Sequence, residues 1–164
     1  MKNLEIIKAK IFNKESLKRE LAVWRFKNKK IVFTNGCFDI LHLGHINYLS
    51  KAKDFGDVLV IGLNTDDSVS RIKDKHRPVI NENARAMILA SLHFVDAIVL
   101  FDEDTPYNLI KQVQPDILVK GSDYKTGDIV GADIVKAKGG EIITIEFLDG
   151  YSTTSIINKL KKGE

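Results

Sequence analysis

The side chains of this sequence best suited to chemistry are two histidines three residues apart, in His42-Leu43-Gly44-His45. They follow the apolar run 30–33, a predicted buried strand, and precede 46–53, where apolar residues recur as on one helix face. At a strand-to-helix turn, backbone N–H groups and the helix dipole attract an anion, and a glycine lets a phosphate approach the main chain. Imidazoles donate hydrogen bonds to phosphoryl oxygens. The pattern therefore predicts an anion site at this turn.

Three other polar stretches follow apolar runs that are predicted to be strands: residues 64–68, 120–125 and 146–154. Ligands of parallel sheets bind beyond the carboxyl ends of the strands, so these stretches are expected to converge with the histidine turn on one cleft. Residues 152–154, Ser-Thr-Thr, stand at a predicted helix start. One hydroxyl there is ordinarily an N-cap, but three hydroxyls beside backbone N–H groups also suit a phosphate.

Strand and helix patterns alternate along the chain. The predicted strands are continuously apolar, as in sheets covered on both faces, and span 30–33, 57–63, 95–101, 116–120 and 141–145. The predicted helices span 13–26, 46–55, 82–92, 105–113, 132–138 and 155–161. These patterns predict a doubly wound α/β fold: a Rossmann-like, open, parallel five-stranded sheet with helices on both faces.

Residues 1–164 are expected to form a single domain, in which 1–28 is an N-terminal helical extension and 70–81 a basic loop. In the helix predicted at 82–92, the candidate inward side chains are Ala84, Met87, Ile88 and Ser91. Arg85 also lies on this helix, although the helix is otherwise poor in charged residues.

The bulk composition excludes several classes of protein. A net charge of +3 does not favour a nucleic-acid binder. No run approaches the roughly 20 apolar residues of a membrane span, and the start of the chain lacks a signal-peptide pattern. Cys37 is the single cysteine, which fits a reducing compartment, and is interpreted as a small turn or core residue. The expectation is a cytoplasmic protein without nucleic-acid or membrane partners.

Five segments together resemble a known enzyme family: 35–42, 77–79, 104–106, 119–124 and 150–157. They are similar to the D-glycero-β-D-manno-heptose 1-phosphate adenylyltransferases, members of the H-x-G-H nucleotidylyltransferase superfamily that also occur as the C-terminal domain of a bifunctional heptose kinase/adenylyltransferase. The resemblance implies transfer of AMP from ATP to the sugar 1-phosphate, giving ADP-heptose and pyrophosphate for a surface glycan such as the lipopolysaccharide core. At 164 residues, the chain has no room for the kinase domain, so the stand-alone form is expected.

The resemblance also implies residue roles. Catalysis is assigned to His42, His45 and Lys120. Nucleotide binding is assigned to Thr34, Asn35, Gly36, Cys37, Phe38, His42, Gly44, His45, Arg85, Lys120, Gly121, Asp123, Tyr124, Ser152, Thr153 and Thr154. Sugar-phosphate binding is assigned to Asp39, Asn64, Asp66 and Arg77, although Asp66 is equally readable as a helix cap. Mg²⁺ is expected to arrive with ATP, without a dedicated protein metal site, and the chain is expected to form a homodimer.

Two alternatives remain open. Glycerol-3-phosphate cytidylyltransferases share the histidine turn, but they carry an arginine before the Ser-Thr-Thr element, where this chain has 146–149 without one. They also tend to have Gly-Asp-Asp-Trp where this chain has Gly-Ser-Asp-Tyr at 121–124. A nucleotide-binding module without chemistry is the other alternative. It is weakened by the absence of G-x-G-x-x-G after the first predicted strand and by the presence of both histidines.

Overall fold

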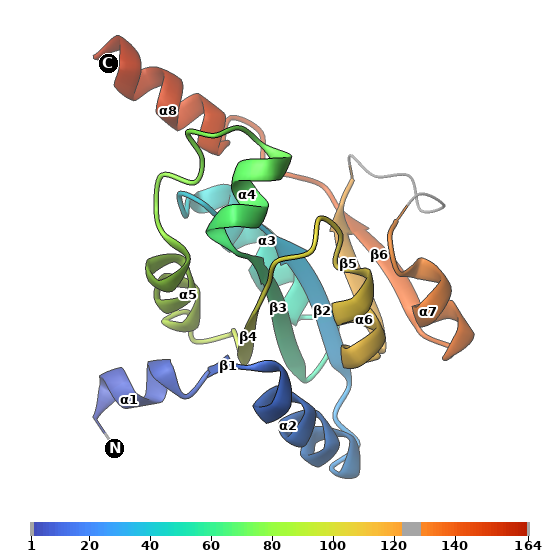
Figure 1. The fold of residues 1–164 in the computed structure, drawn as a ribbon. Helices are drawn as coiled ribbons and strands as arrows, with labels where there is room; N and C mark the ends of the chain where they lie inside the picture. The colour runs from blue at the N-terminus through green and yellow to red at the C-terminus, as the bar shows by residue number, and fades with distance from the viewer. Residues whose placement is uncertain (1, 123–128, 164) are drawn as a thin grey trace.

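The computed structural model describes residues 2–122 and 129–163, which form an open parallel sheet with helices on both faces (Figure 1). Within these residues the sheet has six strands in the order β1-β4-β3-β2-β5-β6. Their bounds are β1 Ile11–Phe12, β2 Ile31–Gly36, β3 Val58–Asn64, β4 Ala97–Phe101, β5 Ile117–Gly121 and β6 Glu141–Ile145. The helices are α1 Asn3–Lys8, α2 Lys14–Phe26, α3 Leu43–Lys53, α4 Asp66–Ile72, α5 Glu82–Ala90, α6 Tyr107–Val113, α7 Ala132–Ala137 and α8 Thr153–Lys162.

The doubly wound parallel fold is confirmed, but the predicted number of strands was wrong. The additional strand is β1, which pairs in parallel with β4 through Ile11 and Phe12. A strand of two residues is too short to show a periodicity, so the sequence pattern does not detect it. The segment 1–28, expected to be a helical extension, therefore contributes an edge strand between α1 and α2.

Two apolar layers hold the helices on the sheet. One layer joins α2, α6 and α7 to one face, with Leu17 and Leu21 of α2 at 0% and 1% exposure. The other joins α3 and α5 to the opposite face, through residues such as Leu49 and Leu89. Truncating such a side chain to alanine costs about 2–5 kcal/mol of folding free energy. The packing fixes the ends of the central strands, where the polar stretches begin.

Two local expectations were wrong. The loop predicted at 70–81 starts inside α4, whose N-cap Thr65 accepts a hydrogen bond from the backbone N–H of Ser68 at 3.2 Å. Helix α5 turns a different face inward, because Arg85, Ala86, Leu89 and Ala90 are buried while Ile88 is 38% exposed. Charged residues are rarely buried, so Arg85, for which the resemblance implies a phosphate contact, is not among the residues predicted to face inward. None of the four buried residues is among the four predicted to face inward.

Strand β2 occupies the middle of the sheet, between β3 and β5. The chain winds from β2 outwards to β3 and β4, and then returns to the other side of β2 for β5 and β6. This reversal creates a topological switch point at the carboxyl ends of β2 and β5, where ligands of such sheets bind. Figure 1 shows α8 projecting from the same end of the molecule as α4. Among the described helices, none has the length and apolar character needed to cross a bilayer.

Candidate active site

The two histidines lie at the turn between β2 and α3, and their rings stack on one another. His42 is the N-cap residue of α3 and His45 lies within its first turn. The ring centroids are 3.7 Å apart, and the ring planes are inclined by 21°. The Phe38 ring meets His45 edge-on, with 5.2 Å between the centroids. The turn therefore presents both imidazoles as one pair.

Burial disfavours the charged form of both imidazoles. Desolvation, followed by the neighbouring His42, lowers the pKa of His45 to about 4, although a hydrogen bond to the backbone of Ile40 acts in the opposite direction. Desolvation also lowers the pKa of His42. The Nδ1 atoms of both rings are buried, and neither has a hydrogen-bond partner among the described residues. Leaving a buried polar atom unpaired costs about 1–3 kcal/mol, so the pair is suited to a ligand that supplies the missing partners.

Gly44 is required by the close packing inside this turn. A Cβ at this position would lie 3.0 Å from Nδ1 of His42 and 3.1 Å from Cβ of Tyr151. The second distance also shows that the segment before α8 reaches the histidine turn. Two further contacts stabilise this arrangement: the Tyr48 ring packs on Phe147 at 5.9 Å between centroids, and the Tyr48 hydroxyl shares a 2.8 Å hydrogen bond with Thr34. The structure thus brings together stretches 34–45 and 146–154.

Lys120 reaches the same end of the sheet from β5. Its side chain is 8% exposed, and Nζ donates a hydrogen bond to Oδ1 of Asn35, at the end of the adjacent strand β2. Gly121 closes β5 beside it, whereas Asp123 and Tyr124 lie outside the described residues. The switch point thus holds a cation next to the histidine turn.

The hydroxyl stretch 152–154 opens α8. Ser152 is the N-cap, and its Oγ accepts from the backbone N–H of Ser155 at 3.0 Å. The Ser152 and Thr154 side chains line a hollow of about 440 Å³ along α8, together with Lys159 and Lys162. Capping uses Oγ as an acceptor and leaves its O–H as a donor, so the N-cap role does not conflict with anion binding.

The Arg85 side chain points into the protein interior and not to the surface. It is 1% exposed, and four of its five N–H groups are bonded inside the protein. Nη1 donates to the Cys37 carbonyl at 2.6 Å, and Nε to the Ile80 carbonyl at 2.9 Å. Nη2 donates to the Asn64 carbonyl at 2.9 Å and to Oδ1 of Asp66 at 2.7 Å. This geometry differs from the predicted phosphate contact.

Asp39 is also bound within the protein, at 2% exposure. It accepts from the backbone N–H groups of Val79 and Ile80 at 2.8 and 2.9 Å, and from Nε of Arg77 at 2.6 Å. Burial raises the pKa of this carboxyl, but the two backbone hydrogen bonds and the Arg77 guanidinium outweigh it and lower the pKa. Asp39 and Arg77, both predicted to bind sugar phosphate, thus hold each other.

The other predicted site residues differ in how deeply they are buried. Nδ2 of Asn64 donates to Oγ of Ser68 at 2.9 Å, which places this amide in a buried contact. The Asp66 side chain is 37% exposed, the most open of the four predicted sugar-phosphate residues. Burial raises the pKa of the Cys37 thiol, which fits a packed turn residue. Gly36 precedes it, and a Cβ there would lie 2.9 Å from the Phe38 ring.

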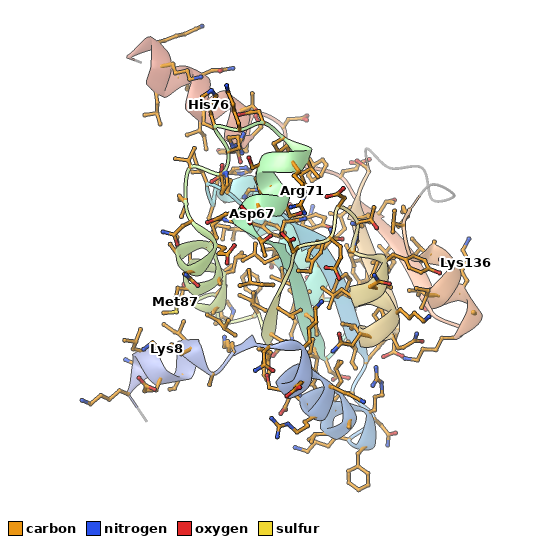
Figure 2. All side chains as sticks on the ribbon, in the orientation of Figure 1. Lys8, Asp67, Arg71, His76, Met87 and Lys136 are labelled. Atoms are coloured by element: carbon orange, nitrogen blue, oxygen red, sulfur yellow. The ribbon has the colours of Figure 1, made fainter. Side chains whose placement is uncertain are left out.

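The sequence patterns missed several residues that shape the site. Tyr48 and Phe147 support the histidine turn, and Glu82 accepts from the backbone N–H of Asp66 at 2.7 Å. A separate hollow of about 670 Å³ lies beyond β4 and is lined in part by Arg71, which pairs with Asp104 at 2.9 Å. Figure 2 shows Arg71 on α4. None of these contacts has a signal in the local sequence, because each joins segments distant along the chain.

Comparison with known proteins places the chain among nucleotidyltransferases. The cytidylyltransferase-like family matches residues 33–159. The protein called bifunctional protein HldE from Citrifermentans bemidjiense is 53% identical over 152 residues, which cover 93% of this chain and 31% of that protein. The HldE protein of Wolinella succinogenes is 49% identical over 152 residues, with the same two coverages. The chain thus spans about a third of the length of these relatives.

Solved structures agree with this placement. A lipopolysaccharide core biosynthesis protein from Thermoplasma volcanium is 30% identical with a TM-score of 0.58, and the match covers 76% of this chain and 99% of that one. A pantoate-beta-alanine ligase from Francisella tularensis, in complex with an ATP ligand and β-alanine, is 20% identical with a TM-score of 0.63, covering 92% of this chain and 76% of that one. The second likeness shows the fold alone. The chain belongs to the cytidylyltransferase-like family of nucleotidyltransferases.

Proposed function

We propose that this chain transfers AMP from ATP to D-glycero-β-D-manno-heptose 1-phosphate, giving ADP-heptose and pyrophosphate. The observation that carries this proposal is the stacked pair His42 and His45, whose buried Nδ1 atoms have no partner among the described residues. The five sequence segments that resemble the heptose enzymes support the sugar substrate. The names of the HldE relatives and of the lipopolysaccharide core biosynthesis protein are consistent with use of the product in a surface glycan.

In the proposed reaction, a phosphate oxygen of the sugar 1-phosphate attacks the α-phosphorus of ATP. A bond forms between that oxygen and the α-phosphorus, and the bond to the bridging oxygen breaks, so that pyrophosphate leaves with the electron pair. The nucleophile is already an anion, so no general base is needed. Catalysis then rests on positioning and on stabilisation of developing charge.

Four sets of groups supply this stabilisation. His42 and His45 donate to the oxygens of the α-phosphate; phosphate binding itself favours their protonated form, since it adds an opposite charge. Lys120 approaches the same oxygens from β5. Mg²⁺ enters bound to the triphosphate, whose oxygens are the ligands it prefers. The N-terminus of α3 adds its backbone N–H groups and dipole.

The remaining residues are proposed to position the two substrates. Thr34–Phe38 and Gly44 line the nucleotide side, and Gly121, Asp123 and Tyr124 hold the base and ribose. Ser152, Thr153 and Thr154 bind the triphosphate at the start of α8. For the sugar phosphate we propose Asp66, which has the most open side chain. Asp39, Asn64 and Arg77 act by holding the loop around it.

One assay tests this function against its rivals. Pyrophosphate release is measured with ATP plus the heptose 1-phosphate, and with CTP plus glycerol 3-phosphate, under the same conditions. The proposal predicts turnover in the first reaction and little in the second. The reverse result supports a glycerol-3-phosphate cytidylyltransferase. Binding of ATP without pyrophosphate release in either reaction indicates a binding module and overturns the enzymatic proposal.

We also propose a homodimer. Ten-residue helix α8 has no buried residue, and Leu160 on it is 69% exposed. Isolated helices of this length are only marginally stable in water, so packing against a second chain would stabilise it. Light scattering on the purified protein is expected to give twice the 18.4 kDa mass of one chain. The mass of a single chain at micromolar concentration contradicts the dimer.

A further inference from the structure

Arg85 joins the histidine turn to two other segments of the chain. Its buried guanidinium bonds the Cys37 carbonyl after β2 and the Asn64 carbonyl at the end of β3. It also bonds the Ile80 carbonyl in the loop before α5. We propose that Arg85 is a positioning residue for nucleotidyl transfer, which fixes the Cys37 carbonyl and so aims the histidine pair. This inference rests on the proposed function.

The contacts of Arg85 and Asp39 close a ring of hydrogen bonds around the turn. Asp39 accepts from the backbone N–H of Ile80 at 2.9 Å, and the carbonyl of the same residue accepts from Arg85 at 2.9 Å. Arg85 then returns to Cys37 at 2.6 Å. Residues 37 and 39 are thus both anchored to the segment 79–85. Because the ring is closed, the turn cannot shift without breaking a buried hydrogen bond.

Phe38 carries this constraint to the histidines. It lies between the two anchored residues and has a φ of 42°, a left-handed conformation that is uncommon for a bulky side chain. Its ring contacts His45 edge-on, and His45 stacks on His42. The anchors on either side hold Phe38 in this conformation and so set the place of its ring. A displacement of the Cys37 carbonyl would therefore move the imidazole pair.

Only an arginine can make this set of contacts. The guanidinium is a rigid, planar fork of five donors, whereas a lysine ammonium is a point charge on a flexible stem. Three carbonyls and one carboxylate surround Arg85 in different directions. A lysine at this position keeps the positive charge but cannot satisfy all four acceptors. The substitution therefore separates positioning from charge.

The first test compares Arg85→Lys with the unaltered protein. Positioning predicts that kcat falls about 100-fold, as expected for reacting groups displaced by about 1 Å. KM for ATP should change less than about threefold, because the ground-state phosphate contacts remain. The NMR signals of the His42 and His45 ring protons, which depend on ring stacking, should move in the substrate-free protein. Unmoved ring signals with a strongly raised KM for ATP overturn the proposal, since they indicate a direct phosphate ligand.

The second test uses Asp66→Ala and applies even if Arg85→Lys does not fold. It removes one of the four acceptors of Arg85. Because the Asp66 side chain is 37% exposed, the variant is expected to fold. Positioning predicts ring signals that move part of the way in the substrate-free protein; kcat is not the readout here, because Asp66 is itself proposed to bind the sugar phosphate. A guanidinium that binds phosphate directly predicts a different result, because its release from the carboxylate lowers KM for ATP. A lowered KM with unmoved ring signals contradicts the proposal.

Arg71→Lys is the matched control. Arg71 contacts Asp102 and Asp104 and is 45% exposed, but it does not contact the histidine turn. Neither kcat nor the histidine ring signals should change. Because the ring signals are read without substrate, they test the positioning role separately from the function. If the ring signals move in Arg85→Lys but the unaltered protein makes no ADP-heptose, the positioning role of Arg85 is supported and the proposed substrate is rejected.

Discussion

The histidine pair leaves buried polar atoms unpaired, whereas the neighbouring network around Arg85 pairs its polar atoms within the protein. The Nδ1 atoms of His42 and His45 are buried without a partner among the described residues. Four N–H groups of Arg85 and both carboxylate oxygens of Asp39 are bonded within the protein. Unpaired buried groups are costly, and paired ones are rigid. The difference separates groups held ready for a substrate from groups that hold them in place.

The largest expected effect is that of His45→Ala. Removing one preorganised donor to a transition state typically lowers kcat about 10²–10³-fold, or roughly 3–4 kcal/mol. The fold should survive, because the substitution also removes a buried unpaired Nδ1. Turnover is measured by pyrophosphate release, and folding by circular dichroism and thermal unfolding. Near-normal turnover in a folded protein would remove His45 from the catalytic residues.

A smaller effect is expected from Gly44→Ala. The added methyl group would lie 3.0 Å from Nδ1 of His42 and 3.1 Å from Cβ of Tyr151, so the ring and the segment before α8 must separate. We expect kcat to fall about 10- to 100-fold, because small misplacements of reacting groups are costly. The loss of folding free energy should be about 1–3 kcal/mol, as for other overpacked sites. Full activity would show that the 42–151 contact is not needed.

Asp39→Asn tests the network around Arg85 and Asp39 mainly through the free energy of unfolding. The pKa of this carboxyl is lowered in the folded protein, so the ionised form stabilises the fold above its ordinary pKa of about 3.9. That stabilisation is lost as the pH falls through the folded-state pKa. The variant should be about 1–3 kcal/mol less stable at pH 7, and the difference should shrink at lower pH. Urea unfolding at several pH values measures this. A difference that grows on acidification contradicts the ion pair with Arg77.

The smallest change is expected in the titration of the unaltered protein. The pKa of about 4 places the protonation of His45 well below neutral pH without ligand. A bound anion favours imidazolium, so pyrophosphate should raise the midpoint of the His45 NMR titration. His93, which follows the end of α5 and packs on Phe94, provides the control, and its ring signal should not respond to pyrophosphate. An unchanged His45 midpoint at saturating pyrophosphate would separate this ring from the anion site.

The sequence predicts those features that follow from local spacing. The histidine turn, the start of α8 and the central strands each show a pattern within a few residues, and the structure forms all of them. Strand β1 is not predicted, because a strand of two residues shows no periodicity. The burial of Arg85 is not predicted, because a charged side chain on a helix is rarely buried. Its partners lie 48 residues away at Cys37 and 21 away at Asn64, and no local pattern identifies them.

The central position of β2 has a consequence for synthesis of the chain. One edge of β2 pairs with β3, which follows soon after it, and the other pairs with β5 through Val32–Ile117 and Phe33–Leu118. The second edge therefore has no native partner until residue 118 has emerged from the ribosome. An unpaired strand edge is a template for pairing with other chains. Aggregation during synthesis is therefore expected to start from this edge of β2, in the interval before β5 is available to cover it.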